Sequence, residues 1–268
     1  MVGRPALPNC VPGASRRAYL SEVEGWFQDR ATGASLDVAA QSKRSEMPTL
    51  VAFISQKGGV GKSMLARALA AVATHGGLKV LLADLDPQQR TLLIWERTRR
   101  NNQVTPTISV QAFENCEAAI DSAAHDNLLI LDTPGQITNG TLALARRAHL
   151  VVQPTGPSVD DLQPAVLVFD ALVKLGIPRE RLVFALCRTI GKGEEDAARE
   201  YLTSAGYEVL WGSIPEKLAY RQALNRGQSV TEAAENALTK RVDNLMEDLL
   251  ARAANAAEQP QEQLQSIG

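Results

Sequence analysis

The chain has 268 residues, of which 45% are hydrophobic and 22% are charged, and its formal net charge is −2. This composition is typical of a globular domain with a full core. The net charge excludes a generally basic nucleic-acid-binding protein, although it leaves room for a local basic patch. No apolar run reaches the length of a membrane span, and the N-terminus lacks the apolar segment of a signal peptide. The cysteines Cys10, Cys116 and Cys187 are widely spaced, which predicts reduced cytosolic thiols rather than a metal site.

The sequence pattern divides the chain into three parts. Residues 1–47 are rich in Gly, Ala, Ser and Pro, and we expect an extension that is loosely ordered or forms short helices. Residues 48–258 form the expected domain, and residues 259–268 form a polar tail. Strands are expected at 49–55, 79–86, 107–113, 127–135, 148–154, 181–189 and 207–212. Helices are expected at 61–77, 141–147, 158–176, 194–206 and 231–254. This alternation predicts an α/β fold with a doubly wound, mostly parallel sheet flanked by helices, which binds ligands at the carboxyl ends of its strands.

The first expected strand runs into the sequence QKGGVGKS, residues 56–63, which departs from the strict phosphate-loop pattern. Gln56 stands where that pattern has its first glycine, and Lys57 adds a second lysine. The glycines allow backbone N–H groups to point at an anion. Lys62 is expected to reach the β- and γ-phosphates, and Ser63 to bind Mg²⁺. A glycine-rich turn that binds nothing is the alternative, but the position between a strand and a helix favours phosphate binding. The residues expected to surround a nucleotide are Lys57, Gly58, Gly59, Val60, Gly61, Lys62, Ser63 and Met64.

Carboxylates follow two further strands. Asp84 and Asp86 are two residues apart at a strand end, so both are expected on one side, facing the phosphate loop. The alternative for this Asp-Pro sequence is a turn or a helix cap. Asp132 ends the apolar run LLILD, an arrangement typical of Walker B, which places a carboxylate near Mg²⁺. The Thr-Pro-Gly that follows it is expected beside the γ-phosphate as a switch loop, with a ligand-free turn as the alternative.

In this order, KGGVGKS, DLDPQ and LLILDTPG resemble the ParA/MinD family of deviant Walker A ATPases, from about residue 49 to about residue 258. The resemblance implies a P-loop NTPase that binds ATP and Mg²⁺ and forms a homodimer on ATP binding. It assigns Lys57 to the phosphates of the other subunit, in the manner of an arginine finger supplied in trans. It assigns Asp86 to positioning the attacking water and Asp84 to the switch region near Mg²⁺. The implied catalytic residues are therefore Lys57, Lys62 and Asp86, whereas a solvated Lys57 at a strand end is the alternative.

Residues 214–230, IPEKLAYRQALNRGQSV, resemble the late segment of ParA proteins. In that segment an Ile-Pro lies at the nucleotide base, and a helix leads to a glycine before the last helix. The resemblance assigns these places to Ile214, Pro215 and Gly227.

The features of other branches of the family are missing from the sequence. A basic C-terminal membrane helix, cluster cysteines and a tyrosine cluster are all absent, so the chain resembles the ParA branch, which binds DNA without sequence preference. The implied partners are DNA and a ParB-like centromere-binding protein, with no membrane, in the cytoplasm on the nucleoid. Positioning of a protein cargo, such as a carboxysome or chemoreceptor cluster, VirC1-like recruitment of DNA-transfer machinery and a non-enzymatic DNA coat are the alternatives. Candidate DNA contacts, each of which is otherwise a solvated side chain, are Arg188, Lys192, Lys217, Arg221 and Arg226.

Overall fold

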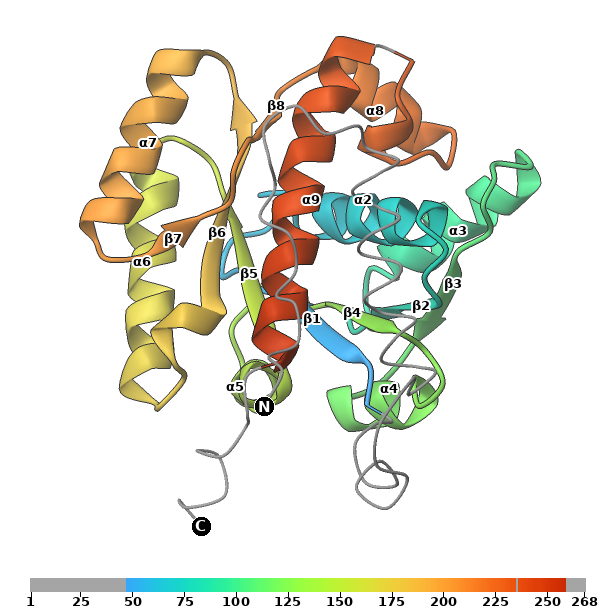
Figure 1. Ribbon diagram of the computed structural model, residues 1–268, viewed down its shortest axis with the longest axis horizontal. Coiled ribbons are helices and arrows are strands. Elements are labelled where there is room, and N and C mark those ends of the chain that lie inside the picture. Colours follow the sequence, from blue (N-terminus) through green and yellow to red (C-terminus); the bar gives the residue numbers. More distant parts are fainter. Residues whose placement is uncertain (1–46, 235, 259–268) are drawn as a thin grey trace, which may run out of the picture.

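The computed structural model describes residues 47–234 and 236–258. The expected N-terminal extension, apart from Met47, and the polar tail lie outside the described residues. The strands are β1 (Thr49–Phe53), β2 (Val80–Asp84), β3 (Ser109–Ala112), β4 (Leu128–Asp132), β5 (Leu150–Thr155), β6 (Leu182–Thr189), β7 (Glu208–Val209) and β8 (Ile214–Pro215). Seven of them pair in the order β3-β2-β4-β1-β5-β6-β7, and β8 pairs with β6. Every pairing is parallel, so the predicted doubly wound sheet is confirmed (Figure 1).

Helices cover both faces of this sheet. The helices are α2 (Lys62–His75), α3 (Thr91–Asn101), α4 (Cys116–Ser122), α5 (Asn139–Arg147), α6 (Val159–Lys174), α7 (Lys192–Ser204), α8 (Leu218–Asn225) and α9 (Asn236–Glu258), with the short 3₁₀ turns η2 (Arg179–Arg181) and η3 (Val230–Glu232). Among the described residues, α2, α3, α8 and α9 contribute to one apolar core, and α4 to α7 contribute to the other. Alternate residues of β1 enter the two cores, because successive side chains of a strand point to opposite faces.

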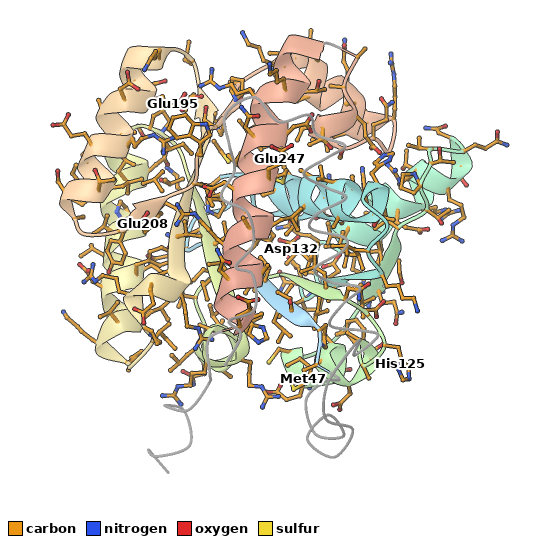
Figure 2. All side chains as sticks on the ribbon, viewed as in Figure 1. Met47, His125, Asp132, Glu195, Glu208 and Glu247 are labelled. Carbon is orange, nitrogen blue, oxygen red and sulfur yellow. The ribbon has the colours of Figure 1, made fainter. Side chains whose placement is uncertain are left out.

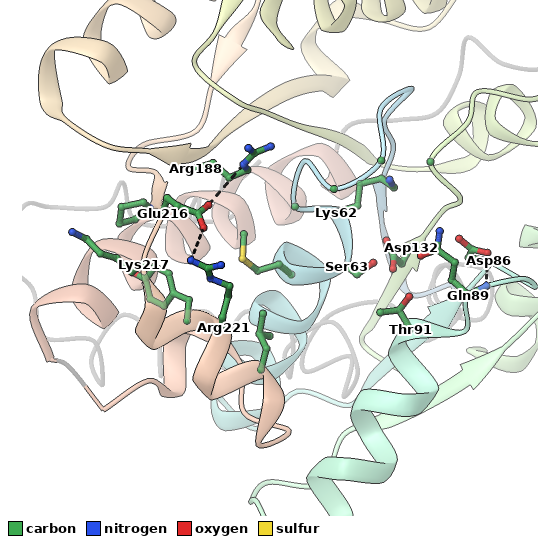
Figure 3. A pocket seen from close by; sticks show the side chains of 18 of the residues that line it. Lys62, Ser63, Asp86, Gln89, Thr91, Asp132, Arg188, Glu216, Lys217 and Arg221 are labelled. Atoms are coloured by element: carbon green, nitrogen blue, oxygen red, sulfur yellow. Dashed lines mark hydrogen bonds and ion pairs between the residues drawn. The ribbon is translucent and has the colours of Figure 1, made fainter. Parts of the chain in front are cut away.

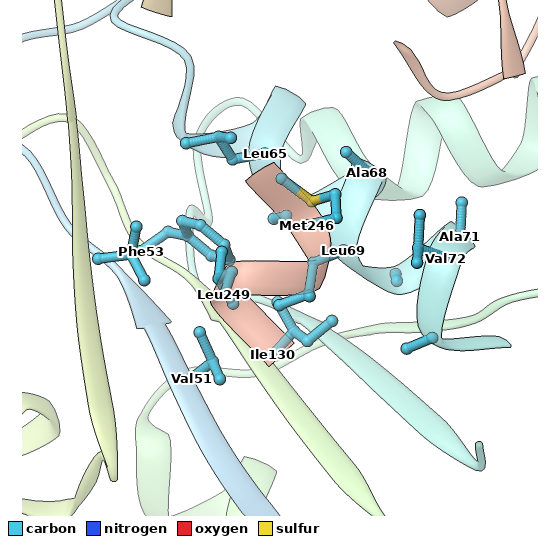
Figure 4. Packing of buried hydrophobic residues seen from close by; sticks show 14 of the residues in the cluster. Val51, Phe53, Leu65, Ala68, Leu69, Ala71, Val72, Ile130, Met246 and Leu249 are labelled. Carbon is cyan, nitrogen blue, oxygen red and sulfur yellow. The ribbon is translucent and has the colours of Figure 1, made fainter. Parts of the chain in front are cut away.

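The core around α2 explains how the phosphate loop is supported. Leu65, Leu69 and Val72 lie on the buried face of α2 and pack with Met246 and Leu249 of α9 (Figure 4). These side chains are at most 1% exposed, and burying each large one stabilises the fold by about 1.5–3 kcal/mol. Gly76 and Gly77 end α2 as expected, since Gly77 adopts a left-handed φ of 86°. The loop is therefore anchored between a central strand and a tightly packed helix.

The structure corrects two expectations about elements and adds two helices. The helix expected at 231–254 is divided, because Ser229 and Glu232 form a capping box that makes η3 a separate turn, and α9 begins only at Asn236. The strand expected at 207–212 shrinks to β7, since the N–H of Trp211 donates to Asp248 instead of to a strand. Helices α3 and α4 were not expected from the sequence.

The unexpected α3 has a physical explanation. Its buried face consists of Leu92, Trp95 and Arg99, so a charged residue interrupts the apolar period. Arg99 is 2% exposed and is neutralised by two hydrogen bonds to Glu232, at 2.7 and 2.8 Å.

Within residues 47–234 and 236–258, none of the helices combines the length and apolar character needed to cross a lipid bilayer.

Candidate nucleotide site

The strand register brings the predicted residues to one edge of the sheet. Asp132 pairs in register with Phe53 of β1 on one side and with Asp84 of β2 on the other. The phosphate loop leaves β1 at this edge and enters α2 at Lys62. A cleft of about 580 Å³ opens here, between the loop and α8 (Figure 3). The predicted residues that line it are Gly58, Gly59, Gly61, Lys62, Ser63, Met64, Asp86, Asp132 and Pro215. Lys57, Val60 and Asp84 do not line it.

The loop conformation requires its glycines. Gly59 and Gly61 have φ values of 75° and 116°, which side chains rarely adopt. The Ser55 hydroxyl accepts a hydrogen bond from the N–H of Lys57 at 3.0 Å and donates to its carbonyl at 2.9 Å. Gly61 caps α2 without a side-chain hydrogen bond, so the first N–H groups of this helix remain available for an anion in the cleft. Val60 is buried and contributes only its backbone to the loop.

Lys62 and Asp132 face each other across the floor of the cleft. Lys62 is 8% exposed, and burial lowers its pKa, opposed by the nearby carboxylates of Asp132 and Asp86. Burial raises the pKa of Asp132 to about 7, against the hydrogen bond from Ser63 and the charge of Lys62. In Figure 2, Asp132 lies near the centre of the molecule.

The donor set beside Ser63 fits Mg²⁺. The Oδ1 atom of Asp132 is buried and has no hydrogen-bond partner among the described residues. Because Mg²⁺ binds oxygen ligands and is commonly held through one or two carboxylates, an unpartnered carboxylate oxygen next to a hydroxyl is suited to it. These two residues are the ones that the sequence assigned to the metal.

Asp84 and Asp86 have different positions, which corrects the expectation that both face the phosphate loop. Asp84 is 2% exposed, and its two oxygens accept the N–H groups of Asp86 and Leu92, each at 3.0 Å. Burial raises the pKa of Asp84, and these backbone hydrogen bonds oppose the shift. Asp86 lines the cleft, and its Oδ1 accepts the N–H groups of Gln88 and Gln89 at 3.0 Å. The turn that carries Asp86 is therefore ordered by Asp84 from behind.

Lys57 does not line the cleft of its own subunit. Its side chain is 54% exposed, and its Nζ atom donates to Oδ1 of Asp161, in the first turn of α6. Asp161 also accepts the hydroxyl of Ser158 at 2.9 Å. Ser158 is the N-cap residue of α6, but its hydroxyl bonds to Asp161 and not to the helix backbone. Burial would raise the pKa of Asp161, but the hydrogen bonds from Lys57 and Ser158 hold it below its usual value.

Three of the five candidate DNA contacts line the cleft, and two do not. Arg188, Lys217 and Arg221 line the cleft, and Glu216 lies between the two arginines, 3.8 Å from Arg188 Nε and 3.6 Å from Arg221 Nη2 (Figure 3). Arg226 lies outside the cleft lining at the end of α8 and is exposed.

The fifth candidate, Lys192, also lies outside the cleft lining. It begins α7, and its exposed side chain donates to both oxygens of Asp196, at 2.8 and 2.6 Å.

Arg67 lies near the site carboxylates without lining the cleft, and sequence reasoning missed it. It is 7% exposed, its Nη2 donates to the carbonyl of Thr91 at 2.9 Å, and its guanidinium lies 5.4 Å from the centroid of the Trp95 ring. Burial lowers its pKa to about 10, against the charges of Asp132 and Asp84. The signal in the sequence was an arginine inside the otherwise apolar run LARALAAV.

A family model now identifies the chain. The model described as the CobQ/CobB/MinD/ParA nucleotide binding domain matches residues 51–230. The chain belongs to this family. The fold and the family predicted from the sequence are thus both confirmed, and nucleotide binding is the property that the family description names.

The chain is similar to two relatives and one solved structure that bear ParA/MinD-type names. Maintenance of carboxysome distribution protein A of Gloeobacter kilaueensis is 26% identical over 189 residues, which cover 70% of this chain and 86% of the relative. The chromosome-partitioning ATPase Soj of Thermus thermophilus is 27% identical over 243 residues, covering 77% and 97%. The septum site-determining protein MinD of Pyrococcus horikoshii, complexed with Mg-ADP, has a TM-score of 0.61 at 18% identity, covering 78% and 99%. The relatives have different cargoes, so similarity alone does not select one.

Proposed function

We propose that the protein is a ParA-type ATPase that forms an ATP-dependent sandwich dimer. The observation that carries this proposal is that Lys57 belongs to the phosphate loop but does not line the cleft of its own subunit, and instead pairs with Asp161. A cation in that place is available to phosphates that a second subunit presents. Lys62 then neutralises the β- and γ-phosphates from within the subunit, and Lys57 adds charge only when two loaded subunits meet.

The remaining residues of the cleft have separate roles in this proposal. Ser63 and Asp132 hold Mg²⁺, which supplies charge neutralisation at the phosphates. Asp86 lies at the cleft and positions the water that attacks the γ-phosphate, whereas Asp84 orders the turn that carries it. Pro215 and the residues after it lie where a base and ribose fit, beyond the phosphate loop.

Substitution of the two lysines tests this division of roles. Lys62→Ala is expected to lose ATP binding, because the in-cis cation is removed. Lys57→Ala is expected to bind ATP like the parent but to form no dimer and to hydrolyse no ATP. Nucleotide titration, light scattering and phosphate release measure the three properties. Lys192→Ala is the matched control, since Lys192 is also an exposed lysine paired with an aspartate. A Lys57→Ala protein that dimerises and turns over ATP normally would contradict the proposal.

We further propose that the ATP dimer binds DNA without sequence preference and segregates a plasmid or other DNA cargo with a ParB-like partner. The 27% identity of this chain to Soj, which covers 77% of the chain, supports a DNA cargo. A dimer doubles any basic patch, so DNA affinity is expected to rise with ATP. If about four phosphates are contacted, log K falls with log salt with a slope of roughly −4. The assay is fluorescence anisotropy on unrelated duplexes with ADP, ATP or no nucleotide.

The structure sharpens the choice of variant for this assay. Arg226→Ala tests DNA contact alone, because Arg226 is exposed and outside the cleft lining. Arg188 and Arg221 line the cleft, so their substitution would alter nucleotide binding as well. Lys174→Ala at the end of α6 is the control. Equal DNA binding in ADP and ATP, or none in either, would favour the second candidate function. That candidate is positioning of a protein cargo, which the 26% identity to the carboxysome distribution protein supports.

A further inference from the structure

A polar cluster lies behind one wall of the cleft and joins three elements. It consists of Glu195 on α7 (Figure 2), Ser213 between β7 and β8, and Arg241 on α9. Arg241 Nε and Nη2 donate to the Ser213 hydroxyl oxygen at 3.0 and 2.6 Å, and Nη2 also donates to Glu195 Oε2. The Ser213 hydroxyl donates to the same Glu195 oxygen at 2.9 Å. Each of the three side chains therefore contacts the other two.

Two of the three polar members are buried, whereas the Arg241 side chain is 40% exposed. Ser213 is 0% exposed and Glu195 is 9% exposed. The second oxygen of Glu195 accepts Arg199 Nη2 at 3.3 Å, and the same nitrogen donates to the carbonyl of Gly212 at 3.0 Å. A partly buried charged pair adds little stability, but its hydrogen-bonded network favours one geometry when its polar atoms are satisfied. The geometry fixed here is that of residues 212 and 213.

This geometry is transmitted directly to the cleft. Ser213 immediately precedes β8, and Pro215, Glu216 and Lys217 line the cleft. The segment is fixed at a second point by the end of β6, because the N–H of Glu216 donates to the carbonyl of Thr189 at 3.0 Å, and the Thr189 hydroxyl is 3.2 Å from that of Ser213. In the proposed function, the phosphates bind to the glycine loop on the other side of the cleft. This wall is therefore left for the base and ribose of a nucleotide.

We infer that Glu195, Ser213 and Arg241 are positioning residues that hold the base-side wall of the cleft, so that α9 and α7 set the affinity for the nucleoside part of the ligand. The inference rests on the proposed nucleotide binding. It separates two parts of the ligand, because a disordered wall weakens contacts to the base and ribose and leaves the glycine loop intact. The cluster thus governs the ratio between the affinity for ATP and the affinity for inorganic tripolyphosphate.

The test measures the dissociation constants of ATP and of inorganic tripolyphosphate, each with Mg²⁺, by isothermal titration of the full chain. Ser213→Ala is the main variant, because it removes the shared hydroxyl and leaves the net charge unchanged. Arg241→Met is the second, and it keeps the aliphatic stem. We expect ATP affinity to fall about tenfold in each, as for other residues that orient a binding group from behind, while tripolyphosphate affinity stays within about twofold. Asp196→Asn, on the exposed face of α7, the helix that carries Glu195, is the control and should change neither affinity.

Three outcomes would overturn the inference. The first is an equal loss of affinity for ATP and tripolyphosphate in Ser213→Ala, which would indicate general unfolding of the site. The second is an unchanged ATP affinity in both variants. The third is a parent protein that binds the two ligands equally well, because the wall would then contribute nothing. A parent that binds neither ligand would instead refute the proposed nucleotide binding itself. Thermal unfolding of each variant establishes that the compared proteins are folded.

Discussion

Gly227 lies directly against the backbone of a neighbouring helix. It follows α8 with a left-handed φ of 76°. A Cβ atom there would lie 2.8 Å from the carbonyl carbon of Thr98 and still closer to the backbone N and Cα of Arg99. The obstacle is the backbone of α3, which cannot rotate away as a side chain can. The change to test is therefore Gly227→Ala, which adds a single methyl group.

Two costs add up in this variant. A left-handed alanine costs about 1–2 kcal/mol, and overpacking against a neighbouring element costs about 1–3 kcal/mol. The free energy of unfolding should therefore fall by about 2–5 kcal/mol. In a domain of 150–250 residues each 1 kcal/mol lowers Tm by about 2–4 °C, so we expect Tm to fall by about 10 °C. Scanning calorimetry and urea unfolding measure the two quantities.

A second glycine separates the two costs. Gly176, after α6, has a similar φ of 88°, but a Cβ atom there would meet nothing within 4 Å. Gly176→Ala should therefore show only the backbone cost of about 1–2 kcal/mol. The close approach of the segment after α8 to α3 is refuted if the two variants lose the same stability.

Three further changes test the cleft and the contacts around it. Gly135→Ala would place its Cβ 3.3 Å from the phosphate loop, so titration should show ATP affinity about tenfold weaker with an unchanged Tm, and parent-like affinity would be the contrary result. Glu232→Gln should destabilise the fold by about 3 kcal/mol at pH 7, because Arg99 loses its buried partner. Burial alone would raise the pKa of Glu232, but the hydrogen bonds from Arg99 and a backbone N–H lower it below the unfolded value of 4.5. The loss of unfolding free energy relative to the parent, measured by urea unfolding, should therefore be largest above pH 4.5 and shrink as pH falls through the folded pKa of Glu232. A loss that stays constant with pH would contradict this. Asp161→Asn should let the ATP dimer form at protein concentrations about two- to fivefold lower, because it releases Lys57; light scattering that shows a weaker dimer would exclude a restraining role.

The central part of the fold could be predicted because local signals agreed with one another. The runs that became β1, β2 and β4 are continuous and apolar, as expected of strands buried on both faces. The glycine pair ended α2 where the sequence placed its end. Helix α3 and turn η3 were missed for a shared reason. Their positions depend on the contact between Arg99 and Glu232, which are far apart in sequence.

The candidate site was predictable residue by residue at the phosphate loop and less so elsewhere. Glycine spacing fixes backbone geometry locally, so most of that loop lines the cleft as expected. The arginines were predicted by charge alone, and charge does not reveal that Arg188 and Arg221 share Glu216 at the cleft. The partner of Lys57 has no local signal, because it depends on a tertiary contact. The buried position of Arg67 had one local signal, its place inside an apolar run, but its contact with Thr91 is also tertiary.

The pair Asp84 and Asp86 shows why the alternation of a strand was an insufficient guide. Alternation places residues two apart on the same side only while the chain stays extended, and β2 ends at Asp84. The chain turns at once, since the carboxylate of Asp84 accepts the N–H of Asp86 and then that of Leu92 at the start of α3. The sequence offered two interpretations, a turn or helix cap and a functional carboxylate. Each of them applies to one of the two residues. Asp84 shapes the turn from the interior, and this leaves Asp86 as the carboxylate of the pair that meets the cleft.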